Sequence, residues 1–451
     1  MDFREKIPNI AAMNQPTVKD AMKQIYFKWT CLGIGCILSL QTLAQEGTWW
    51  GKLELPGHTL TLVFHLDADQ PTIDSPDQGV KGIPLKRGEA SIPNVLFSIP
   101  SIGASFTGVW LGKQMTGTFT QQGYNFPMTL VPGAPVRNRP QTPKPPFPYT
   151  CEEVTFTNGN ATLKGTLTLP PNCHKHTPVC ILITGSGLQN RDEELFGHKP
   201  FAVIADAFAR NGIATLRYDD RGFGESTGDL IRVTTEDLKN DARAGIRLLR
   251  ERFDKVGVLG HSEGGTIALM LAAEQQADWV ISLAGMTVSG EATLLAQNRQ
   301  LLQKNGYTAQ VTDAYLKALQ AVFGQLTQGE KPVLPDVSAL PDELKANLQQ
   351  VVKTSDTPYL RYFLKLNIAD KLPLIKCPIL ALNGTKDTQV DCQTNLSVLE
   401  NGLQRALLTA HPCEELNHLF QHCNTGAVEE YKDIEETFAP EVLQRMIEWI
   451  Q

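Results

Sequence analysis

Short apolar runs alternate with helix-like segments through the second half of the chain, and this alternation restricts the fold more than any other feature. Between two runs, apolar residues recur at spacings of three and four, as on one helix face: Leu238, Ala242, Ile246, Leu249 and Phe253. Short uninterrupted apolar runs are typical of parallel strands buried on both faces. We therefore predict an α/β fold with a parallel sheet covered by helices. Its predicted strands are residues 179–184, 213–218, 256–259, 280–284 and 379–383.

The segments around this alternation divide the chain into domains. Residues 45–131 contain short β-rich runs separated by Gly and Pro, which predicts a small all-β domain. Residues 132–148 (PGAPVRNRPQTPKPPFP) are rich in proline and predict a stiff linker. The α/β domain is then expected over residues 149–451. Within it, residues 286–376 separate two strands by a long Leu-, Ala- and Gln-rich segment, which we interpret as a helical cap insertion over the site.

The first 44 residues have the pattern of an export signal. Lys23 and Lys28 precede an apolar run at residues 31–40, and small residues lead up to Ala44. A basic stretch, a short apolar stretch and small residues before a cut are typical of a signal peptide. We predict cleavage after Ala44 and a periplasmic or extracellular protein. The run is shorter than the about 20 apolar residues that a membrane span needs, so no stable membrane insertion is expected.

Other interpretations of this N-terminal segment are possible. The mixed charges of residues 1–21 suggest that Met22 is the true start and that the upstream part is an extension. An uncleaved membrane anchor is one alternative to the signal peptide. A lipoprotein anchored at Cys36 is another, although Gly33 stands where a branched apolar residue would be expected.

Charge and cysteine content limit the partners and cofactors. The net charge is -7 and no run of Lys and Arg is present, so nucleic acid is not an expected partner. Seven of the nine cysteines remain after the predicted cleavage, and Cys413 and Cys423 are the closest candidates for pairing. The histidines beside them do not have the spacing of a zinc site, so we expect no metal and no cofactor. Oligomeric state is left open.

The pentapeptide 260–264 (GHSEG) matches G-x-S-x-G, the sharp turn that exposes a serine hydroxyl between a strand and a helix. It follows the predicted strand 256–259 and precedes a helix-like run, GTIALM. By itself the pentapeptide is a weak signal, because chance matches are common. In this context Ser262 is predicted to be a catalytic nucleophile.

A nucleophilic serine needs a histidine base and an acid that orients the base, and in this fold their order is Ser, acid, His. Asp387 ends the segment NGTKD directly after a predicted strand, and His418 follows in NHLF. We predict that they complete a triad with Ser262. A turn or helix-cap role is the alternative for Asp387, and His411 and His422 compete with His418.

The oxyanion of an acyl-transfer intermediate needs backbone N–H donors. We expect one from Glu263, the residue after the nucleophile, and the other from Ser186 in the glycine-rich loop after the first buried strand. Residues 219–224 (DDRGFG) follow the next strand. There we favour ion pairs and turn hydrogen bonds that tie loops together over substrate contact.

From about residue 151 to 451 the sequence resembles the α/β-hydrolase superfamily, particularly secreted bacterial carboxylesterases grouped with serine aminopeptidase-like hydrolases that have an N-terminal β-domain. The motifs that carry the resemblance are TGSG, DDRGFGES, GHSEGG, NGTKD and NHLFQ, in that order. The resemblance implies a serine esterase that cleaves a small-molecule carboxylic ester through an acyl-enzyme. TGSG departs from the His-Gly type of oxyanion loop that many relatives have.

Two other functions fit the same residues. An aminopeptidase or amidase would use the same triad but would need a carboxylate to anchor the substrate amine. A catalytically inactive, secreted glycan-binding protein would instead use the β-domain, with Trp49, Trp50 and Trp110 stacking on sugars, although tryptophans in such domains are more often part of the core.

Overall fold

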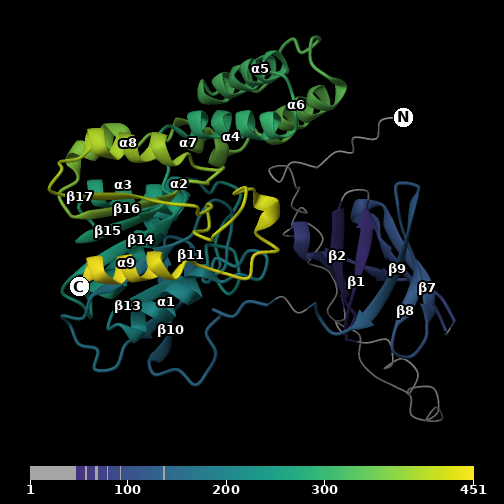
Figure 1. Cartoon of the computed structure of the whole chain (residues 1–451), viewed down its shortest axis with the longest axis horizontal. Coiled ribbons are helices and arrows are strands. Elements are labelled where there is room, and N and C mark those ends of the chain that lie inside the picture. Colours follow the sequence, from purple (N-terminus) through teal and green to yellow (C-terminus); the bar gives the residue numbers. More distant parts are fainter. Residues whose placement is uncertain (1–46, 56–57, 67–69, 79, 92, 136–137) are drawn as a thin grey trace. The chain divides into compact units, whose positions relative to one another are not determined.

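The computed structural model describes residues 47–451 except 56–57, 67–69, 79, 92 and 136–137. The described chain forms two compact units that divide between residues 138 and 139 (Figure 1). The predicted export signal, its cleavage after Ala44 and the start at Met22 lie outside the described residues. Among the helices of the described part, none has the length and apolar character needed to cross a membrane.

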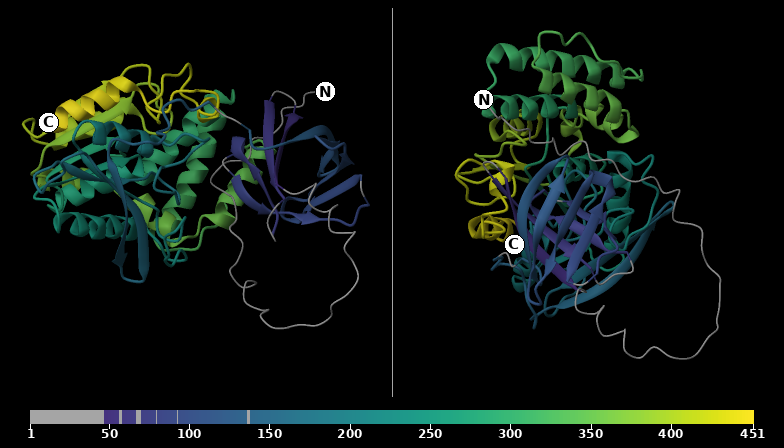
Figure 2. Two further views of the ribbon diagram at one scale, coloured as in Figure 1. Left: turned by 90° about the horizontal axis from the view of Figure 1, so that it is seen from below. Right: turned by 90° about the vertical axis from the view of Figure 1, so that its right-hand side faces the viewer.

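The N-terminal unit is an antiparallel β-domain with strands in the order β4-β3-β2-β1-β9-β8-β7-β6-β5. The end strands β4 and β5 are consecutive in the chain and separated only by Leu85, so the sheet curls around a shared interior (Figure 2). Its described elements are β1 (Thr48–Leu55), β2 (His58–His65), β3 (Thr72–Ser75), η3 (Pro76–Gln78), β4 (Val80–Pro84), β5 (Lys86–Arg87), β6 (Asn94–Ile99), η4 (Pro100–Ile102), β7 (Ala104–Trp110), β8 (Met115–Gln121) and β9 (Tyr124–Pro132).

Aromatic side chains fill the interior of the β-domain. Phe64, Phe97 and Phe106 are buried and their ring centroids lie 5.8 to 6.1 Å apart. Trp49 is also part of this core, and Trp110 packs against it. The alternation of buried and exposed residues along β1 and β6 is the pattern of strands with one face toward a core.

The second unit is built on an eight-stranded sheet in the order β10-β11-β13-β12-β14-β15-β16-β17. Strands β10 and β11 form a hairpin, in which Asn158 pairs with Ala161, and run antiparallel, whereas β13 through β17 are parallel to β12 or to one another. The strand bounds are β10 (Thr150–Asn158), β11 (Ala161–Leu169), β12 (Val179–Ile183), β13 (Ala214–Tyr218), β14 (Val256–His261), β15 (Trp279–Leu283), β16 (Ile379–Gly384) and β17 (Leu408–Cys413).

Helices cover both faces of this sheet, as the α/β prediction requires. The buried residues of α2, α3 and α8 share one core with one face, and those of α1 and α9 share a second core with the other (Figure 1). Their bounds are α1 (Pro200–Arg210), α2 (Thr235–Arg250), α3 (Glu263–Ala273), α8 (Cys392–Gly402), η6 (Val428–Glu430) and α9 (Pro440–Ile450). Helix α2, predicted from its apolar spacing, begins with a capping box between Thr234 and Asp237.

The segment predicted as a cap is helical. It contains α4 (Gly290–Lys304), α5 (Ala309–Thr327), α6 (Asp342–Thr354), α7 (Pro358–Lys365) and η5 (Ala369–Leu374). Helices α4 to α7 have a hydrophobic core of their own, which is why this insertion can fold between β15 and β16 without entering the sheet. In Figure 1, α7 and α4 continue to the right of α8 at about the same level, and α5 and α6 lie above α4.

Candidate active site

Ser262 occupies the sharp turn between β14 and α3. Its backbone has φ 54° and ψ −119°, a positive φ that non-glycine residues rarely adopt. The turn requires glycine on both sides, because a Cβ on Gly260 would overlap the Gly264 carbonyl and a Cβ on Gly264 would overlap the Ile183 carbonyl. The GHSEG pentapeptide therefore folds as a strained strand-to-helix turn that presents residue 262 at the carboxyl end of the sheet.

Asp387 and His418 lie in loops that follow β16 and β17, and their side chains form a buried pair. His418 Nδ1 and Asp387 Oδ2 are 2.7 Å apart. Asp387 Oδ1 accepts the backbone N–H groups of Gln389 (2.8 Å) and Val390 (2.9 Å), and Asn383 donates to Oδ2. These bonds fix the carboxylate so that it orients the imidazole, as a base needs.

The competing histidines lie elsewhere. His411 is within β17, and exposed His422 pairs with Glu436 and Glu441.

Ser262 and His418 are linked through their neighbours. The ring of His261, the residue before Ser262, has its centroid 4.6 Å from that of His418. On the other side, a Cβ built on Gly185 would lie 3.2 Å from Ser262 Cβ. The Ser262 turn, the His418 loop and the glycine-rich loop after β12 therefore lie next to one another at the carboxyl edge of the sheet.

The two predicted oxyanion donors lie beside this point. Glu263 is the first residue of α3, so its backbone N–H is among those that a helix leaves without an internal partner. The N–H of Gly185 donates to Glu193 Oε1 at 2.8 Å, which leaves the next amide, that of Ser186, as the better candidate on the glycine-rich loop.

The Glu263 side chain is held inside the protein. Thr235 donates to Oε1 at 2.6 Å and Tyr359, from cap helix α7, donates to Oε2. Ser186 also forms a side-chain hydrogen bond with the carboxylate. The residue is 1% exposed, and burial raises the pKa of its carboxyl group. The side chains of both predicted oxyanion residues and one cap residue thus form a single network.

Asp220 supports the glycine-rich loop from the end of β13. Its carboxylate accepts the Thr184 hydroxyl at 3.0 Å and the Gln189 N–H at 2.8 Å. Burial raises the pKa of this carboxyl group to about 8, because desolvation and the nearby Glu193 charge outweigh those two hydrogen bonds.

We expect Asp220→Asn to make the stability less dependent on pH. Between the ordinary carboxyl pKa of about 4 and the folded value of about 8, the folded protein binds more protons than the unfolded chain, so stability falls as pH rises. Asparagine keeps an acceptor for Thr184 and Gln189 without the charge. Melting temperatures of wild type and variant should be measured at about pH 5 and above about pH 8. The difference in melting temperature between the two proteins should be larger at the higher pH. The control is Asp229→Asn, at an exposed position. An equal change of melting temperature with pH in all three proteins would contradict the expectation.

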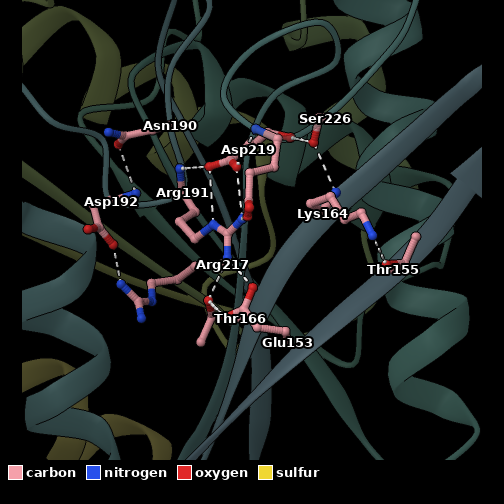
Figure 3. Close-up of polar contacts among 11 residues, drawn as sticks. Glu153, Thr155, Lys164, Thr166, Asn190, Arg191, Asp192, Arg217, Asp219 and Ser226 are labelled. Atoms are coloured by element: carbon pink, nitrogen blue, oxygen red, sulfur yellow. Dashed lines mark hydrogen bonds and ion pairs between the residues drawn. The ribbon is translucent and has the colours of Figure 1, made fainter.

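Asp219, the neighbour of Asp220, belongs to a polar cluster around Arg191 (Figure 3). Arg191 donates to both of its carboxylate oxygens, at 3.2 and 2.8 Å, and also to Glu153 and Thr166. The Ser226 hydroxyl donates to the Asp219 carbonyl at 2.7 Å. These contacts tie the loops after β12 and β13 to the β10–β11 hairpin, in agreement with the structural role expected for residues 219–224.

Among the described residues, the cysteines form no disulfide and the side chains that could bind a metal form no metal site. All seven described cysteines are free, so the pairing considered for Cys413 and Cys423 is not formed. Cys413 is buried in the core of the sheet, while the Cys423 thiol contacts the Glu415 carbonyl. Within residues 47–451, gaps excepted, no group of three or more His, Cys, Asp or Glu side chains is arranged to hold a metal ion.

Comparison with known proteins bears on the fold of this unit. A family model described as "Serine aminopeptidase, S33" matches residues 199–421, which include Ser262, Asp387 and His418. Together with the strand order and the strained serine turn, this match decides the fold. Residues 139–451 form a domain with the α/β-hydrolase fold. The expected fold class is therefore confirmed, with an all-β domain before it.

One curated relative of the α/β-hydrolase domain is esterase EstD of Thermotoga maritima. It is 34% identical over 140 residues, which are 30% of this chain and 33% of that protein. The match thus covers about a third of the length of that relative.

Solved structures similar to the α/β-hydrolase domain include a Pyrococcus furiosus esterase (16% identity, 67% of this chain and 92% of that chain, TM-score 0.40). A proline iminopeptidase of Mycobacterium smegmatis is also similar (15% identity, 66% and 97%, TM-score 0.43).

Three residues of the α/β-hydrolase site were not singled out from the sequence: Glu193, Thr235 and Tyr359. Glu193 lies in the charged stretch NRDEE shortly after TGSG, where a charge near the glycine-rich loop was the only available signal. Thr235 and Tyr359 lie on helices α2 and α7 with no motif around them.

Proposed function

We propose that the protein is a serine hydrolase that cleaves small-molecule carboxylic esters through an acyl-enzyme intermediate. The observation that carries the proposal is the buried Asp387–His418 hydrogen bond at the same sheet edge as the strained turn of Ser262. A serine hydroxyl is a weak nucleophile without a base, and an oriented histidine supplies that base.

In the proposed mechanism, His418 Nε2 takes the proton of Ser262 as the serine oxygen attacks the ester carbonyl. The tetrahedral intermediate collapses as His418 returns the proton to the leaving alcohol. Water, activated by the same imidazole, then attacks the acyl-serine and releases the acid. Asp387 keeps a proton on Nδ1 and stabilises the imidazolium in both steps. The backbone N–H groups of Glu263 and Ser186 bind the oxyanion.

The contacts of Glu263 favour esters over an aminopeptidase substrate. A peptide amine would need a carboxylate that is free to bind an ammonium group in the substrate pocket. Both Glu263 oxygens accept hydroxyl groups of the protein, from Thr235 and Tyr359, and the side chain is 1% exposed. The carboxylate beside the nucleophile is therefore committed to internal hydrogen bonds.

The glycan-binding alternative has less support in the β-domain. Trp49 is 4% exposed and is part of the core, and the indole N–H of Trp110 donates to the Gly112 carbonyl. We retain export to the periplasm or outside the cell as part of the proposal, because the N-terminal pattern supports it. N-terminal sequencing of the exported protein would test cleavage after Ala44.

A fluorophosphonate probe is expected to label the protein once, at Ser262, because such probes react with activated serines. Mass spectrometry of the labelled peptide would identify the residue. For a matched aryl ester and aryl amide of one short acyl group, we expect kcat/KM to be higher for the ester. Failure of labelling would argue against the mechanism, and a preference for the amide would favour the amidase function.

A further inference from the structure

A second acid–histidine pair lies directly behind the proposed nucleophile. His261 Nδ1 is 2.9 Å from Glu193 Oε1, and His261 Nε2 is 2.9 Å from the backbone carbonyl oxygen of His418. Both side chains are buried, with 8% and 4% of the His261 and Glu193 side chains exposed. The proposed mechanism assigns neither of them a role.

The acceptors around His261 define where its protons are. A carbonyl oxygen can only accept, so Nε2 must carry a proton to bond with His418. A carboxylate likewise accepts from Nδ1–H, so the ring bonds to both partners as an imidazolium. Burial opposes this charge, but the Glu193 carboxylate outweighs burial and raises the pKa of His261 above its ordinary value. The pair is thus a buried, charge-assisted link between two loops.

Glu193 also holds the glycine-rich loop. The same Oε1 atom that faces His261 accepts the backbone N–H of Gly185 at 2.8 Å. The backbone of Glu193 has φ 53°, a left-handed conformation that non-glycine residues rarely adopt. Residues are kept in such conformations where the surrounding structure requires them, often at functional sites. In Glu193 the conformation occurs in a residue whose carboxylate bonds both to Gly185 of the glycine-rich loop and to His261.

We propose that Glu193 and His261 are positioning residues that join the oxyanion loop to the loop of the catalytic histidine, with Ser262 between them. This inference rests on the proposed triad. One end of the link is the N–H of Gly185, next to Ser186, and the other is the carbonyl of His418 itself. A shift of either loop would misplace a donor or the base relative to Ser262, and displacements of about 1 Å cost about 100-fold in rate.

Two near-isosteric variants cut the link at different places. Glu193→Gln keeps an oxygen for Gly185 N–H but removes the charge that supports the imidazolium. His261→Asn keeps an amide N–H near Glu193 and loses the bond to the His418 carbonyl. We expect each variant to lower kcat roughly 10- to 100-fold, with KM changed by less than about twofold. The rate of labelling by a fluorophosphonate should fall in parallel, because it needs the same nucleophile and base.

The double variant should lose little more activity than the single variants, because the two residues act as one unit. His198→Asn is the matched control. His198 is also fully buried, and its two ring nitrogens lie 2.9 Å from the Thr437 hydroxyl oxygen and 2.9 Å from the Tyr431 carbonyl oxygen, rather than beside Glu193 and the His418 carbonyl. We expect it to lower the melting temperature as His261→Asn does, with kcat unchanged.

The outcomes separate this inference from the proposed function. If the wild type is labelled and active, but the Glu193 and His261 variants keep its kcat and labelling rate, the positioning role is wrong and the triad stands. If His198→Asn lowers kcat as much as they do, the effect is one of general stability and the inference is also wrong. A wild type that is neither labelled nor active would overturn the proposed function and this inference with it.

Discussion

Ser262→Ala is expected to lower kcat for ester hydrolysis by on the order of 10⁶-fold, because the acyl-enzyme route needs the serine oxygen. The base and the oxyanion donors remain but have no nucleophile to assist. Alanine at this position keeps the strained turn between β14 and α3, since it has the same Cβ as serine. We therefore expect the melting temperature to change little and fluorophosphonate labelling to disappear.

Ser75→Ala is a suitable control for Ser262→Ala. Ser75 is a buried serine of the β-domain, 3% exposed, whose hydroxyl donates to Gln78. The substitution removes one serine hydroxyl and one hydrogen bond and changes no residue of the hydrolase domain. A steady-state assay with a short-chain aryl ester should give wild-type kcat for Ser75→Ala. Substantial turnover by Ser262→Ala would mean that another group performs the chemistry.

The fold of the second domain could be predicted from the sequence, because the patterns that indicate its strands and helices each lie within one short segment. Strands β12 to β16 are short, mostly apolar runs, and the apolar spacing of α2 is contained within one helix, so each element could be recognised from its own residues. The position of Ser262 followed in the same way from a pentapeptide between a strand and a helix. Asp387 and His418 could be proposed because parallel strands bring the loops at their carboxyl ends to one edge.

The support around the site could not be predicted, because it depends on contacts between distant residues. Glu193 and His261 are 68 residues apart, and Tyr359 and Glu263 are 96 apart. Neither pair has a spacing, motif or periodicity that would connect its members. The link of Glu193 to His261 requires the loop after β12 to fold back against β14, and the Tyr359 contact requires the cap to pack on α3. These placements follow from tertiary packing alone.

Asp387→Asn is expected to lower kcat by about 10⁴-fold through the tautomer of His418. Asp387 Oδ1 accepts the N–H groups of Gln389 and Val390, so an asparagine must place its single oxygen there. Its NH₂ group then faces Nδ1 of His418, where Oδ2 now accepts. Two donors cannot bond to each other, so Nδ1 must give up its proton and Nε2 must carry it. A protonated Nε2 cannot accept the proton of Ser262.

The same substitution brings the new NH₂ group against Asn383, whose amide now donates to Oδ2 at 3.1 Å, so some loss of stability should accompany the loss of activity. Asp391→Asn separates the two effects. Asp391 caps α8 by accepting the Thr394 N–H at 2.8 Å, and asparagine caps helices equally well, so this variant should keep both stability and kcat. The decisive measurement is kcat relative to melting temperature in the two variants. If Asp387→Asn retained kcat within about tenfold of wild type, Asp387 would not be the residue that sets the tautomer of His418, and the acid of the triad would have to be sought elsewhere.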